Sequence, residues 1–480
     1  MNKLTVDVAV IGTGTAGLTA YRAARAQGKR TVLIESGPYG TTCARVGCMP
    51  SKLLIAASEA AHTVQAAAGF GIHAGQVRID GKEVMARVRR ERDRFVGFVL
   101  EGVDNIPDQD KIIGHARFTG PHSLQVDAHT EIDVARVVIA TGSRPYIPEE
   151  LRDVGPGVIV SDQVFDWTDL PESVAVIGTG VIGLELGQAL HRLGVRVSIY
   201  ARGGSVAHIS DPEVLHVATT VLSAELDLRF QHKLVSARQD GSEVLLTTRD
   251  PLGAERSERF QYVLVTAGRT PNVDNIGIET TGLELDARGI PVFDPMTMQC
   301  GTSAIFIAGD ANNERPLLPE AADHGKIAGD NAGRYPSVHP GLRRTPLAIA
   351  FTEPQIATLG ASYRALCAEG QHTFAVGKVS FENQGRSRVM LQNHGMLRVY
   401  GEYGSGLFLG AEMIGPRAEN LSHTLAWACQ ARMTVAQMLD MPFYHPVIEE
   451  GMRTALRDLA AELEKGAPAQ SKAPDCVPGA

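Results

Sequence analysis

Cysteine, aromatic side chains and long apolar runs are all scarce in this chain of 480 residues. Six scattered cysteines are too few for the disulfide framework of a small secreted domain. No run of about 18 apolar residues could span a membrane, and a predicted strand follows Met1 almost directly, which leaves no room for a signal peptide. These absences predict a cytoplasmic protein without a membrane segment.

An excess of basic charge is also missing. The formal net charge is -8 at pH 7, which gives no indication of a nucleic-acid surface. Glycine, by contrast, is abundant, with 50 copies, and 44% of the residues are apolar, a composition typical of a glycine-rich α/β protein. Because the chain is longer than one hydrophobic core requires, we expect several domains.

The N-terminal stretch VDVAVIGTGTAGLTAYRAARAQGKRTVLIES predicts a strand, a glycine turn, a helix and a second strand. This is the pattern of a dinucleotide-binding unit, in which the pyrophosphate lies on the helix N-terminus. Gly12, Gly14 and Gly17 allow the tight turn, the approach of the pyrophosphate and close packing of helix on strand. Glu35 ends the second strand, where an acidic residue accepts hydrogen bonds from a ribose.

The same pattern returns in SVAVIGTGVIGLELGQALHRLGVRVSIYAR. Gly178, Gly180 and Gly183 occupy the positions of the three N-terminal glycines in the same order of strand, turn, helix and strand. Two such units in one chain predict two separate dinucleotide sites.

The second unit lacks the acidic residue at the end of its second strand. The counterpart of Glu35 is Ala201, and Arg202 follows it. Loss of a carboxylate removes a repulsive charge, and an arginine can grip a ribose 2′-phosphate, with His208 as a second positive contact. This favours NADP(H) over NAD(H). Gly183 argues against NADP(H), because this third glycine is more typical of NAD sites. The alternative interpretation of Arg202 is a solvent-exposed side chain.

Three more strand-and-turn segments follow these units or lie between them. VVIATGSRP contains Thr141 and Gly142, and YVLVTAGRTPN contains Gly268; we interpret both as exits from a nucleotide-binding domain. SAIFIAGDAN places Asp310 directly after a buried strand, where a simple turn is the alternative interpretation.

Cys43 and Cys48 lie five residues apart in YGTTCARVGCMPSKLL. A zinc site needs about four ligands, and no second Cys or His cluster lies nearby in the sequence. A structural disulfide is disfavoured in the cytosol, where cellular thiols reduce it. A redox-active pair fits its neighbours best, because the first dinucleotide unit can hold a flavin and the second a nicotinamide.

TTCARVGCMPSK resembles the active-site motif of the flavin-dependent pyridine nucleotide–disulfide oxidoreductases, the family of dihydrolipoamide dehydrogenase, glutathione reductase and mercuric reductase. The resemblance covers about residues 4–460, with the motifs in the family's order. Pro50-Ser51-Lys52 favours dihydrolipoamide dehydrogenase or mercuric reductase over glutathione reductase, and we take the first as the closest. Arg45 replaces the family's usual Asn between the cysteines, which hints at an anionic or polar substrate; a solvated arginine is the alternative.

The resemblance implies an α/β fold with two Rossmann-like dinucleotide-binding domains and a C-terminal α+β dimerisation domain. The implied boundaries are an FAD domain with the redox disulfide at 1–150, an NAD(P) domain at 151–272, a return to the central FAD domain at 273–344, an interface domain at 345–465 and a flexible tail at 466–480.

The family mechanism also implies individual roles. Cys48 would be the thiolate beside the flavin and Cys43 the sulfur that exchanges with the substrate. Lys52 would lie by the flavin N5 with Glu185 as its ion-pair partner, and Asp310 would bind the ribityl chain. The implied cofactor contacts are, for FAD, Gly12, Gly14, Gly17, Glu35, Lys52, Thr141, Gly142 and Asp310, and for the nicotinamide, Gly178, Gly180, Gly183, Arg202, His208 and Gly268.

A dithiol must lose a proton before it attacks, so the reaction requires a base. His445 precedes Pro446, whose ring biases the residue before it toward an extended backbone. Glu450 is placed to hold the second imidazole nitrogen. The segment resembles the family's His-Pro base, with Val447 in place of Thr. In this family the histidine comes from the partner subunit, which implies a homodimer.

Other functions remain open at this point. An NADPH-dependent mercuric or other disulfide reductase fits Ser51 and Arg202, but the adjacent C-terminal cysteine pair of mercuric reductases is missing, since Cys476 stands alone. High-molecular-weight thioredoxin reductases need a similar pair, and soluble transhydrogenases lack the redox cysteines. A non-catalytic flavin redox sensor would need no base. No metal site is predicted, and the dithiol or disulfide, small or lipoyl-bound, is not named by the sequence.

Overall fold

The computed structural model describes residues 1–370 and 373–467, so that Cys476 and most of the predicted tail lie outside the described residues. Two units can be distinguished. The first comprises Met1–Ala57, Ile79–Leu170 and Leu264–Arg343, and the second comprises Ser58–Arg78, Pro171–Val263 and the chain from Arg344 onward. None of the helices within the described ranges combines the length and apolar character needed to cross a bilayer.

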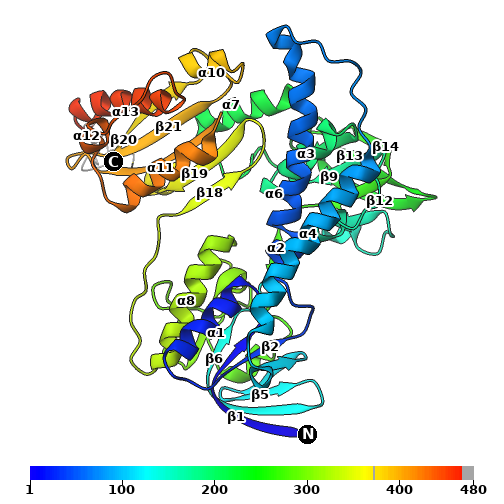
Figure 1. Cartoon of the computed structure of the whole chain (residues 1–480), viewed down its shortest axis with the longest axis vertical. Helices are drawn as coiled ribbons and strands as arrows, with labels where there is room; N and C mark the ends of the chain where they lie inside the picture. Colours follow the sequence, from blue (N-terminus) through cyan, green and yellow to red (C-terminus); the bar gives the residue numbers. More distant parts are fainter. Residues whose placement is uncertain (371–372, 468–480) are drawn as a thin grey trace, which may run out of the picture. The chain divides into compact units, whose positions relative to one another are not determined.

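The first unit is built on a sheet in which β1 lies parallel to β2 on one side and β6 on the other, with β17 parallel to β6 (Figure 1). Alternate residues of β1 enter two different cores, Ala9 and Ile11 on one face and Val8 and Val10 on the other. A strand buried on both faces carries a continuous apolar run, as VAVI does here. The strands of this unit are β1 Asn2–Ile11, β2 Thr31–Glu35, β3 Lys111–Ile113, β4 Ala116–Gly120, β5 Ser123–Val126, β6 Thr130–Ile139, β7 Ser143–Pro145, β8 Val158–Val160, β16 Arg269–Pro271 and β17 Ile305–Ile307.

Helices α1 and α8 cover one face of that sheet and lie side by side (Figure 1). Their backbones approach so closely that a Cβ on Gly325 would lie 2.2 Å from the carbonyl oxygen of Ala16, and a Cβ on Gly329 would lie 2.3 Å from that of Ala20. Glycine is therefore required along this seam of α8. The helices that lie in the first unit or begin there are α1 Thr15–Ala26, α2 Thr42–Val46, α3 Cys48–Ala66, α4 Gly81–Asp104, α5 Ser161–Val164 and α8 Leu318–Arg334.

The second unit contains a second parallel arrangement, with β10 between β9 and β11. An antiparallel sheet of β12, β13 and β14 follows it in the chain. The elements of this region are β9 Ser173–Ile177, α6 Val181–Arg192, β10 Arg196–Tyr200, α7 Pro212–Ser223, β11 Asp227–Arg229, β12 Lys233–Asp240, β13 Glu243–Arg249, β14 Glu255–Phe260 and β15 Tyr262–Val265.

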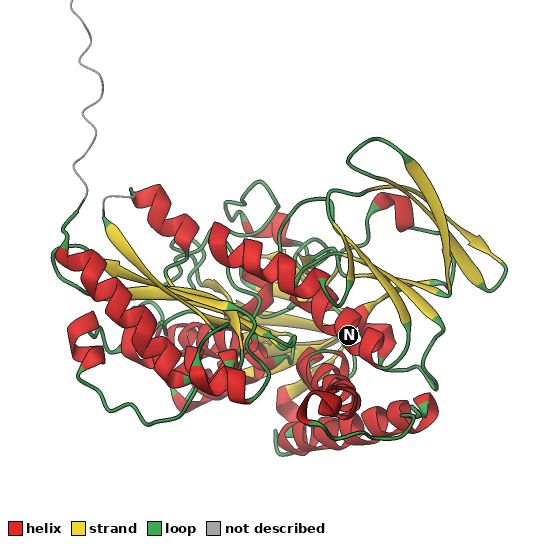
Figure 2. Ribbon diagram, turned by 90° about the horizontal axis from the view of Figure 1, so that it is seen from above, coloured by secondary structure: helices red, strands yellow, loops and turns green. Residues whose placement is uncertain are grey.

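The C-terminal part of the second unit is an antiparallel sheet in the order β18-β19-β22-β21-β20. Successive residues of β22 point to opposite faces, so that Met413 joins the core under α11 and α13 while Ile414 joins the core with α6 and α7. Figure 2 distinguishes the strands, in yellow, from the helices that cover them, in red. The elements are β18 Leu347–Ala350, β19 Gln355–Gly360, α9 Tyr363–Glu369, β20 Phe374–Ser380, α10 Gly385–Val389, β21 Met396–Glu402, β22 Phe408–Gly415, α11 Ala418–Gln430, α12 Val435–Leu439 and α13 Glu449–Glu464.

These two parallel strand arrangements and the C-terminal sheet with its helices confirm the predicted α/β fold class with an α+β C-terminal domain.

Candidate functional site

The turn between β1 and α1 has the geometry that the glycine pattern predicts. Gly12 has a φ of +103°, and a Cβ there would lie 2.3 Å from the carbonyl oxygen of Ala140. A Cβ on Gly17 would lie 1.9 Å from the carbonyl oxygen of Gly12, which shows how tightly α1 packs on the turn. Gly14 differs, because nothing lies within 4 Å of its Cβ position. The space beside Gly14 belongs to a cavity.

That cavity measures about 440 Å³ and is lined by the turn, the end of β2 and the segments after β6 and β16. Thr141 and Gly142 lie on its wall, together with Asn272 and Asn275. The hydroxyl oxygen of Thr141 is buried, and no residue in the described ranges hydrogen-bonds to it. An orphaned hydroxyl and open space beside a helix N-terminus fit a bound dinucleotide.

Glu35 lies on the same wall, at the end of β2. One oxygen of its carboxylate accepts hydrogen bonds from the backbone N–H of Thr13 at 2.9 Å and from the Thr13 hydroxyl at 2.5 Å. The other oxygen accepts from the N–H of Gly37 at 2.9 Å. A carboxylate has about four acceptor sites, so Glu35 keeps capacity for a ribose hydroxyl while it holds the turn.

Asp310 lies near the carboxyl ends of β6 and β15, where β7 and β16, the short strands that follow them, pair with each other. The hydroxyl of Ser143 donates to its carboxylate at 2.8 Å, and Arg269 Nε donates to that hydroxyl at 2.7 Å. Arg269 also donates to the Ser143 carbonyl at 2.6 Å. Gly268 lies beside this pair in the first unit, where its carbonyl accepts from the N–H of Tyr146. The ATG, AGR and GD segments, far apart in the chain, therefore meet at one place.

The two cysteines lie where α2 gives way to α3. Both carry thiols in this structure, and the two side chains are hydrogen-bonded to each other. This hydrogen bond and burial raise the pKa of the Cys43 thiol well above its ordinary value, while the backbone N–H groups of Cys48 and Met49 act in the opposite direction. Cys43 thus needs help to ionise. In the part of the chain that the structure describes, no group of three or more metal-binding side chains occurs.

A second cavity, of about 410 Å³, opens onto Cys43 between α1, α2, α4 and the start of α8. Its lining is largely apolar, with Met49, Phe95 and Phe98 beside Cys43. Arg22 is the one charged side chain among its lining residues. The sequence analysis did not single out Phe95, Phe98 or Arg22, because they lie on α4 and α1, and only tertiary packing brings these helices close to the cysteine on α2.

Arg45 lies away from this second cavity. It lines the first one, and its Nη1 donates to the carbonyl of Pro38 at 3.5 Å. The hint of an anionic substrate held by Arg45 therefore finds no support in its position.

Lys52 and Glu185 belong to different units. Lys52 lies in the first turns of α3, and Glu185 is buried on α6, where its carboxylate accepts from the N–H of Phe351 at 2.9 Å. The ion pair between them stays a prediction.

The second glycine turn, between β9 and α6, repeats features of the first. Gly178 has a φ of +124°, and nothing lies within 4 Å of the Cβ position of Gly180. Gly183 is buried in α6. After β10, Ala201 is buried, and Arg202 is exposed.

The loop that carries Arg202 and His208 is anchored at two points, Ser205 and Ser210. The Thr179 hydroxyl donates to the carbonyl of Ser205 at 2.7 Å, and Glu412 accepts from the N–H and the hydroxyl of Ser210. His208 is exposed on this loop. The anchors leave both basic side chains at the surface beyond β10, where the sequence predicts a ribose phosphate.

His445 and Glu450 form the predicted pair. The imidazole Nδ1 lies 3.0 Å and 3.1 Å from the two carboxylate oxygens, and the N–H of Val447 donates to the same carboxylate at 3.2 Å. These hydrogen bonds lower the pKa of Glu450. The His445–Pro446 peptide bond is cis, and the His445 side chain is 80% exposed. With Nδ1 held by Glu450, Nε2 is presented outward.

This chain is similar to known proteins over nearly its whole length. Residues 6–325 match the model of the pyridine nucleotide-disulphide oxidoreductases, and residues 347–456 match the dimerisation domain of the same family. Mycothione reductase of Mycobacterium tuberculosis is 30% identical over 95% of this chain and 99% of its own. Mercuric reductase of Shigella flexneri is 31% identical over 96% and 82%, and dihydrolipoyl dehydrogenase of Geobacillus stearothermophilus is 29% identical over 96% and 97%.

Solved structures show the same fold at lower identity. LpdA of Mycobacterium tuberculosis superposes with a TM-score of 0.80 at 24% identity, covering 95% of this chain and 99% of its own. The flavoprotein disulfide reductase RclA of Escherichia coli, as a copper complex, gives a TM-score of 0.77 at 22% identity, again covering 95% and 99%.

Proposed function

The chain belongs to the pyridine nucleotide-disulphide oxidoreductases, and we propose that it passes electrons between NADP(H) and a dithiol–disulfide couple of the lipoyl type. The family is one of oxidoreductases that act on sulfur groups with FAD and a pyridine nucleotide. The observation that carries the proposal is the position of Cys43, which lines a largely apolar cavity and is hydrogen-bonded to Cys48.

The residues of the first cavity fit FAD. Gly14 leaves space for the pyrophosphate, Glu35 offers acceptors to a ribose, and Thr141 offers an unpaired hydroxyl to the rest of the cofactor. Asp310 does not line this cavity, and its role as a ligand of the ribityl chain is what the family resemblance implies. When bound, the flavin supplies the two-electron carrier that joins hydride chemistry to thiol chemistry.

The cysteines exchange electrons with the substrate in balanced steps. In the reductive direction the Cys43 thiolate attacks a substrate disulfide, which forms a mixed disulfide and releases one substrate thiolate. The Cys48 thiolate then displaces the second substrate thiolate and closes the Cys43–Cys48 disulfide. In the oxidative direction a substrate dithiol reverses these steps and leaves two cysteine thiols. Two protons accompany the two electrons in each direction. We assign the outward Nε2 of His445 as the atom that transfers these protons, one at a time, to or from the sulfur atoms.

The second cavity favours a substrate with an aliphatic arm. Phe95, Phe98 and Met49 present apolar surface beside Cys43, and one guanidinium is the single charge of the lining. A lipoyl chain matches such a wall, because its carbon atoms are removed from water without unpaired polar groups.

A second candidate is an NADPH-dependent reductase of an anionic disulfide or of mercuric ion. Arg22 on the wall of the second cavity favours it, since a guanidinium binds a substrate carboxylate with two parallel hydrogen bonds. Mercuric reductase is among the relatives of this chain.

For the nicotinamide we propose NADP(H). Ala201 removes the carboxylate that would repel a 2′-phosphate, and Arg202 and His208 stand on an anchored loop just beyond. A clear kinetic preference for NAD(H) over NADP(H) would overturn this assignment.

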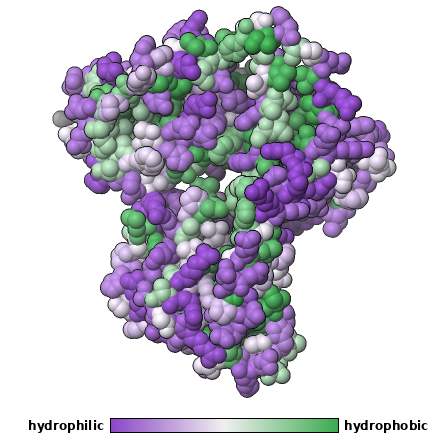
Figure 3. Space-filling view, in the orientation of Figure 1, coloured by the Kyte–Doolittle hydropathy of each residue, from purple (hydrophilic) through white to green (hydrophobic). Residues whose placement is uncertain are grey.

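We further propose that the working form is a homodimer, to which the dimerisation domain points. Apolar side chains lie exposed at the end of α3 and near α10, a region where hydrophobic surface gathers in Figure 3; they are Val64, Phe70, Ile72, Val389 and Leu391. Trp427 and Tyr444 are also exposed, at 72% and 80%. Apolar surface of this kind is typical of a covered interface.

Side-by-side assays test the proposal. The purified protein should carry a flavin, and with NADP⁺ it should oxidise free dihydrolipoamide faster than NADPH drives reduction of glutathione disulfide, mycothione or mercuric ion. Cys43→Ser should abolish turnover with every sulfur substrate while the flavin is still reduced by NADPH. A protein that binds FAD but turns over none of these compounds would be a redox sensor, and the enzymatic proposal would be wrong.

A further inference from the structure

Arg45 is a charged side chain that none of the steps above uses. It lies in the last turn of α2, is half-buried, and lines the first cavity together with Gly14 and Pro38. The residues that line the second cavity, onto which Cys43 opens, do not include it. The charge of Arg45 therefore acts in the first cavity rather than beside the reacting sulfur atoms.

The methylene groups of Arg45 pack against Gly40. Gly40 has a φ of +118°, and a Cβ there would lie 3.0 Å from the Cδ of Arg45 and 3.2 Å from its Cγ. Val96 of α4 closes the same space, 3.1 Å from that Cβ position. The absence of a side chain at residue 40 thus leaves the room in which Arg45 folds back from α2 toward Pro38, whose carbonyl accepts from its Nη1 at 3.5 Å.

The guanidinium of Arg45 keeps most of its hydrogen-bonding capacity. A guanidinium has five N–H donors, and the contact with the Pro38 carbonyl is long for a hydrogen bond. Within residues 1–370 and 373–467, no carboxylate forms an ion pair with Arg45. Because a guanidinium pairs readily with carboxylate or phosphate oxygens, this side chain is prepared for an anion in the cavity.

The other lining residues with a fixed charge offer no free positive charge. Arg144 is paired with Asp274, through Nη1 at 3.0 Å and Nη2 at 2.6 Å. Glu35 is a carboxylate, and its two oxygens hold the turn at Thr13 and the N–H of Gly37. Without Arg45, this wall would therefore present a net negative charge to a bound molecule.

We propose that Arg45 binds the diphosphate of FAD and supplies the positive charge that this cavity otherwise lacks. The proposal rests on the assignment of the first cavity to FAD. The diphosphate is doubly anionic, and a guanidinium offers it parallel charge-assisted hydrogen bonds. Gly14 leaves open space at the start of α1, so the helix N-terminus and the guanidinium share the anion. The asparagine that the family resemblance implies at this position is uncharged, so the role belongs to the arginine of this chain.

The test measures the binding of FAD to the full-length apoprotein by flavin fluorescence, at increasing concentrations of sodium chloride. Arg45→Gln removes the charge and should raise the dissociation constant roughly 10- to 100-fold at low salt. Added salt should weaken binding to the wild type more than binding to Arg45→Gln, because salt screens the charge pair. Equal affinities at low salt, or parallel salt dependences, would overturn the proposal.

Two matched variants separate a contact from a change of net charge. Arg45→Lys keeps the charge and should bind FAD closer to the wild type than to Arg45→Gln, with the salt dependence of the wild type. Arg117→Gln removes a charge at an exposed arginine of β4, outside the lining of the cavity, and should bind FAD as the wild type does. The proposal is wrong if Arg45→Lys binds as weakly as Arg45→Gln, or if Arg117→Gln weakens binding equally.

Thermal unfolding of the apoproteins tests for a structural role of Arg45. Because Arg45 makes no ion pair within the described ranges, the Arg45→Gln apoprotein should unfold near the temperature of the wild type. A destabilised apoprotein whose FAD binding keeps the wild-type salt dependence would make Arg45 a structural residue and contradict the proposal. A wild-type apoprotein that binds no FAD would refute the assignment of the cavity, and with it both the proposed function and the role of Arg45.

Discussion

Gly14 and Gly17 lie three residues apart in the same turn, yet the structure needs them for different reasons. A Cβ on Gly17 collides with backbone at 1.9 Å, and backbone cannot move aside without loss of the β1–α1 unit. A Cβ on Gly14 meets no protein atom within 4 Å and extends into the cavity assigned to FAD.

We therefore predict that Gly14→Ala folds with a stability within roughly 1 kcal/mol of wild type but is purified without its yellow colour. Gly17→Ala should not give folded protein at all. Thermal unfolding and the visible absorption of flavin check both outcomes. A Gly14→Ala protein with full flavin content would contradict the cavity assignment.

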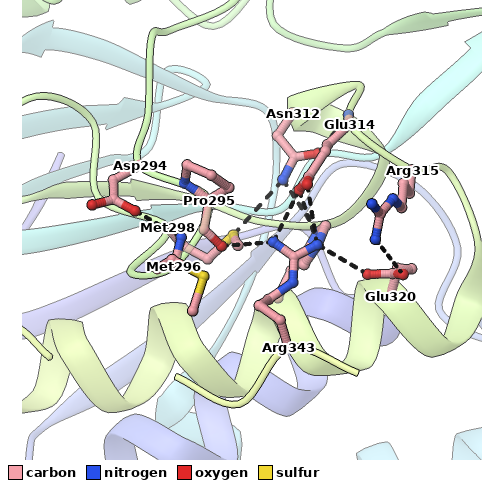
Figure 4. Close-up of polar contacts among 10 residues, drawn as sticks. Asp294, Pro295, Met296, Met298, Asn312, Glu314, Arg315, Glu320 and Arg343 are labelled. Carbon is pink, nitrogen blue, oxygen red and sulfur yellow. Dashed lines mark hydrogen bonds and ion pairs between the residues drawn. The ribbon is translucent and has the colours of Figure 1, made fainter. Parts of the chain in front are cut away.

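The ionisation of Glu320 leads to a second prediction, about how the stability of the folded protein depends on pH. Its carboxylate lies 3.2 Å from Arg343 and 3.4 Å from Arg315 in a cluster of charged side chains (Figure 4). Its pKa is lowered from 4.5 to about 2 in the folded protein. A depressed carboxyl pKa contributes stability that is complete above pH 4.5 and is lost as the pH falls toward 2. Glu320→Gln should therefore be less stable than wild type at neutral pH, by about 3 kcal/mol because it breaks a buried charge cluster.

The difference between the two proteins should shrink as the medium is acidified through that range. Denaturant unfolding at a series of pH values measures it. Glu279→Gln, at an exposed carboxyl of the same unit, serves as the control and should stay close to wild type at every pH. A constant gap between wild type and Glu320→Gln would show that Glu320 does not titrate as the structure indicates.

At the scale of elements, the α1–α8 pair depends on small residues in a way that no local pattern shows. The segment DHGKIAGDNAGR of α8 contains three glycines spaced four apart, which lowers its helix propensity. The structure explains the cost, because the glycines let α8 lie directly on the backbone of α1. The glycine turn in the sequence predicted the helix α1. Its packing partner, α8, comes about 300 residues later in the chain, and only the tertiary structure shows that the two helices pack together.

Two glycine-to-alanine changes in helices should have opposite effects. Gly329→Ala forces a Cβ to within 2.3 Å of the Ala20 carbonyl, so we expect a loss of about 3 kcal/mol. Gly97→Ala, in the middle of α4 with nothing within 4 Å, should gain about 0.5–1 kcal/mol from helix propensity. Chemical denaturation of both variants measures the two signs, and two losses or two gains would contradict the packing described here.

At the scale of the whole molecule, the base and the thiols lie about 400 residues apart in the chain, and the family resemblance places them in different subunits. Cys43→Ser and His445→Ala homodimers should each be inactive with dithiols, while their flavins are still reduced by NADPH. When the two are unfolded, mixed in equal amounts and refolded together, half of the dimers are hybrids with one intact site. Activity should return to about a quarter of wild type. No recovery, with hybrid dimers demonstrated, would place both residues in one subunit.

Much of this protein is determined by local sequence. A strand, a Gly-x-Gly-x-x-Gly turn and a helix specify their own geometry, because the φ of Gly12 and Gly178 and the open space at Gly14 and Gly180 follow from the absence of a side chain. The His445–Glu450 contact is likewise local, since five residues of chain join its partners.

Tertiary structure alone decided the rest. It brings Arg269 and Ser143 to Asp310, sets Arg22, Phe95 and Phe98 around Cys43, turns Arg45 toward the first cavity and buries His324 between two carboxylates. Except for His324 and Glu320, which lie one turn apart on α8, each of these contacts joins residues from separate elements. Their positions depend on how helices and sheets pack against each other, and no spacing within a single segment encodes that.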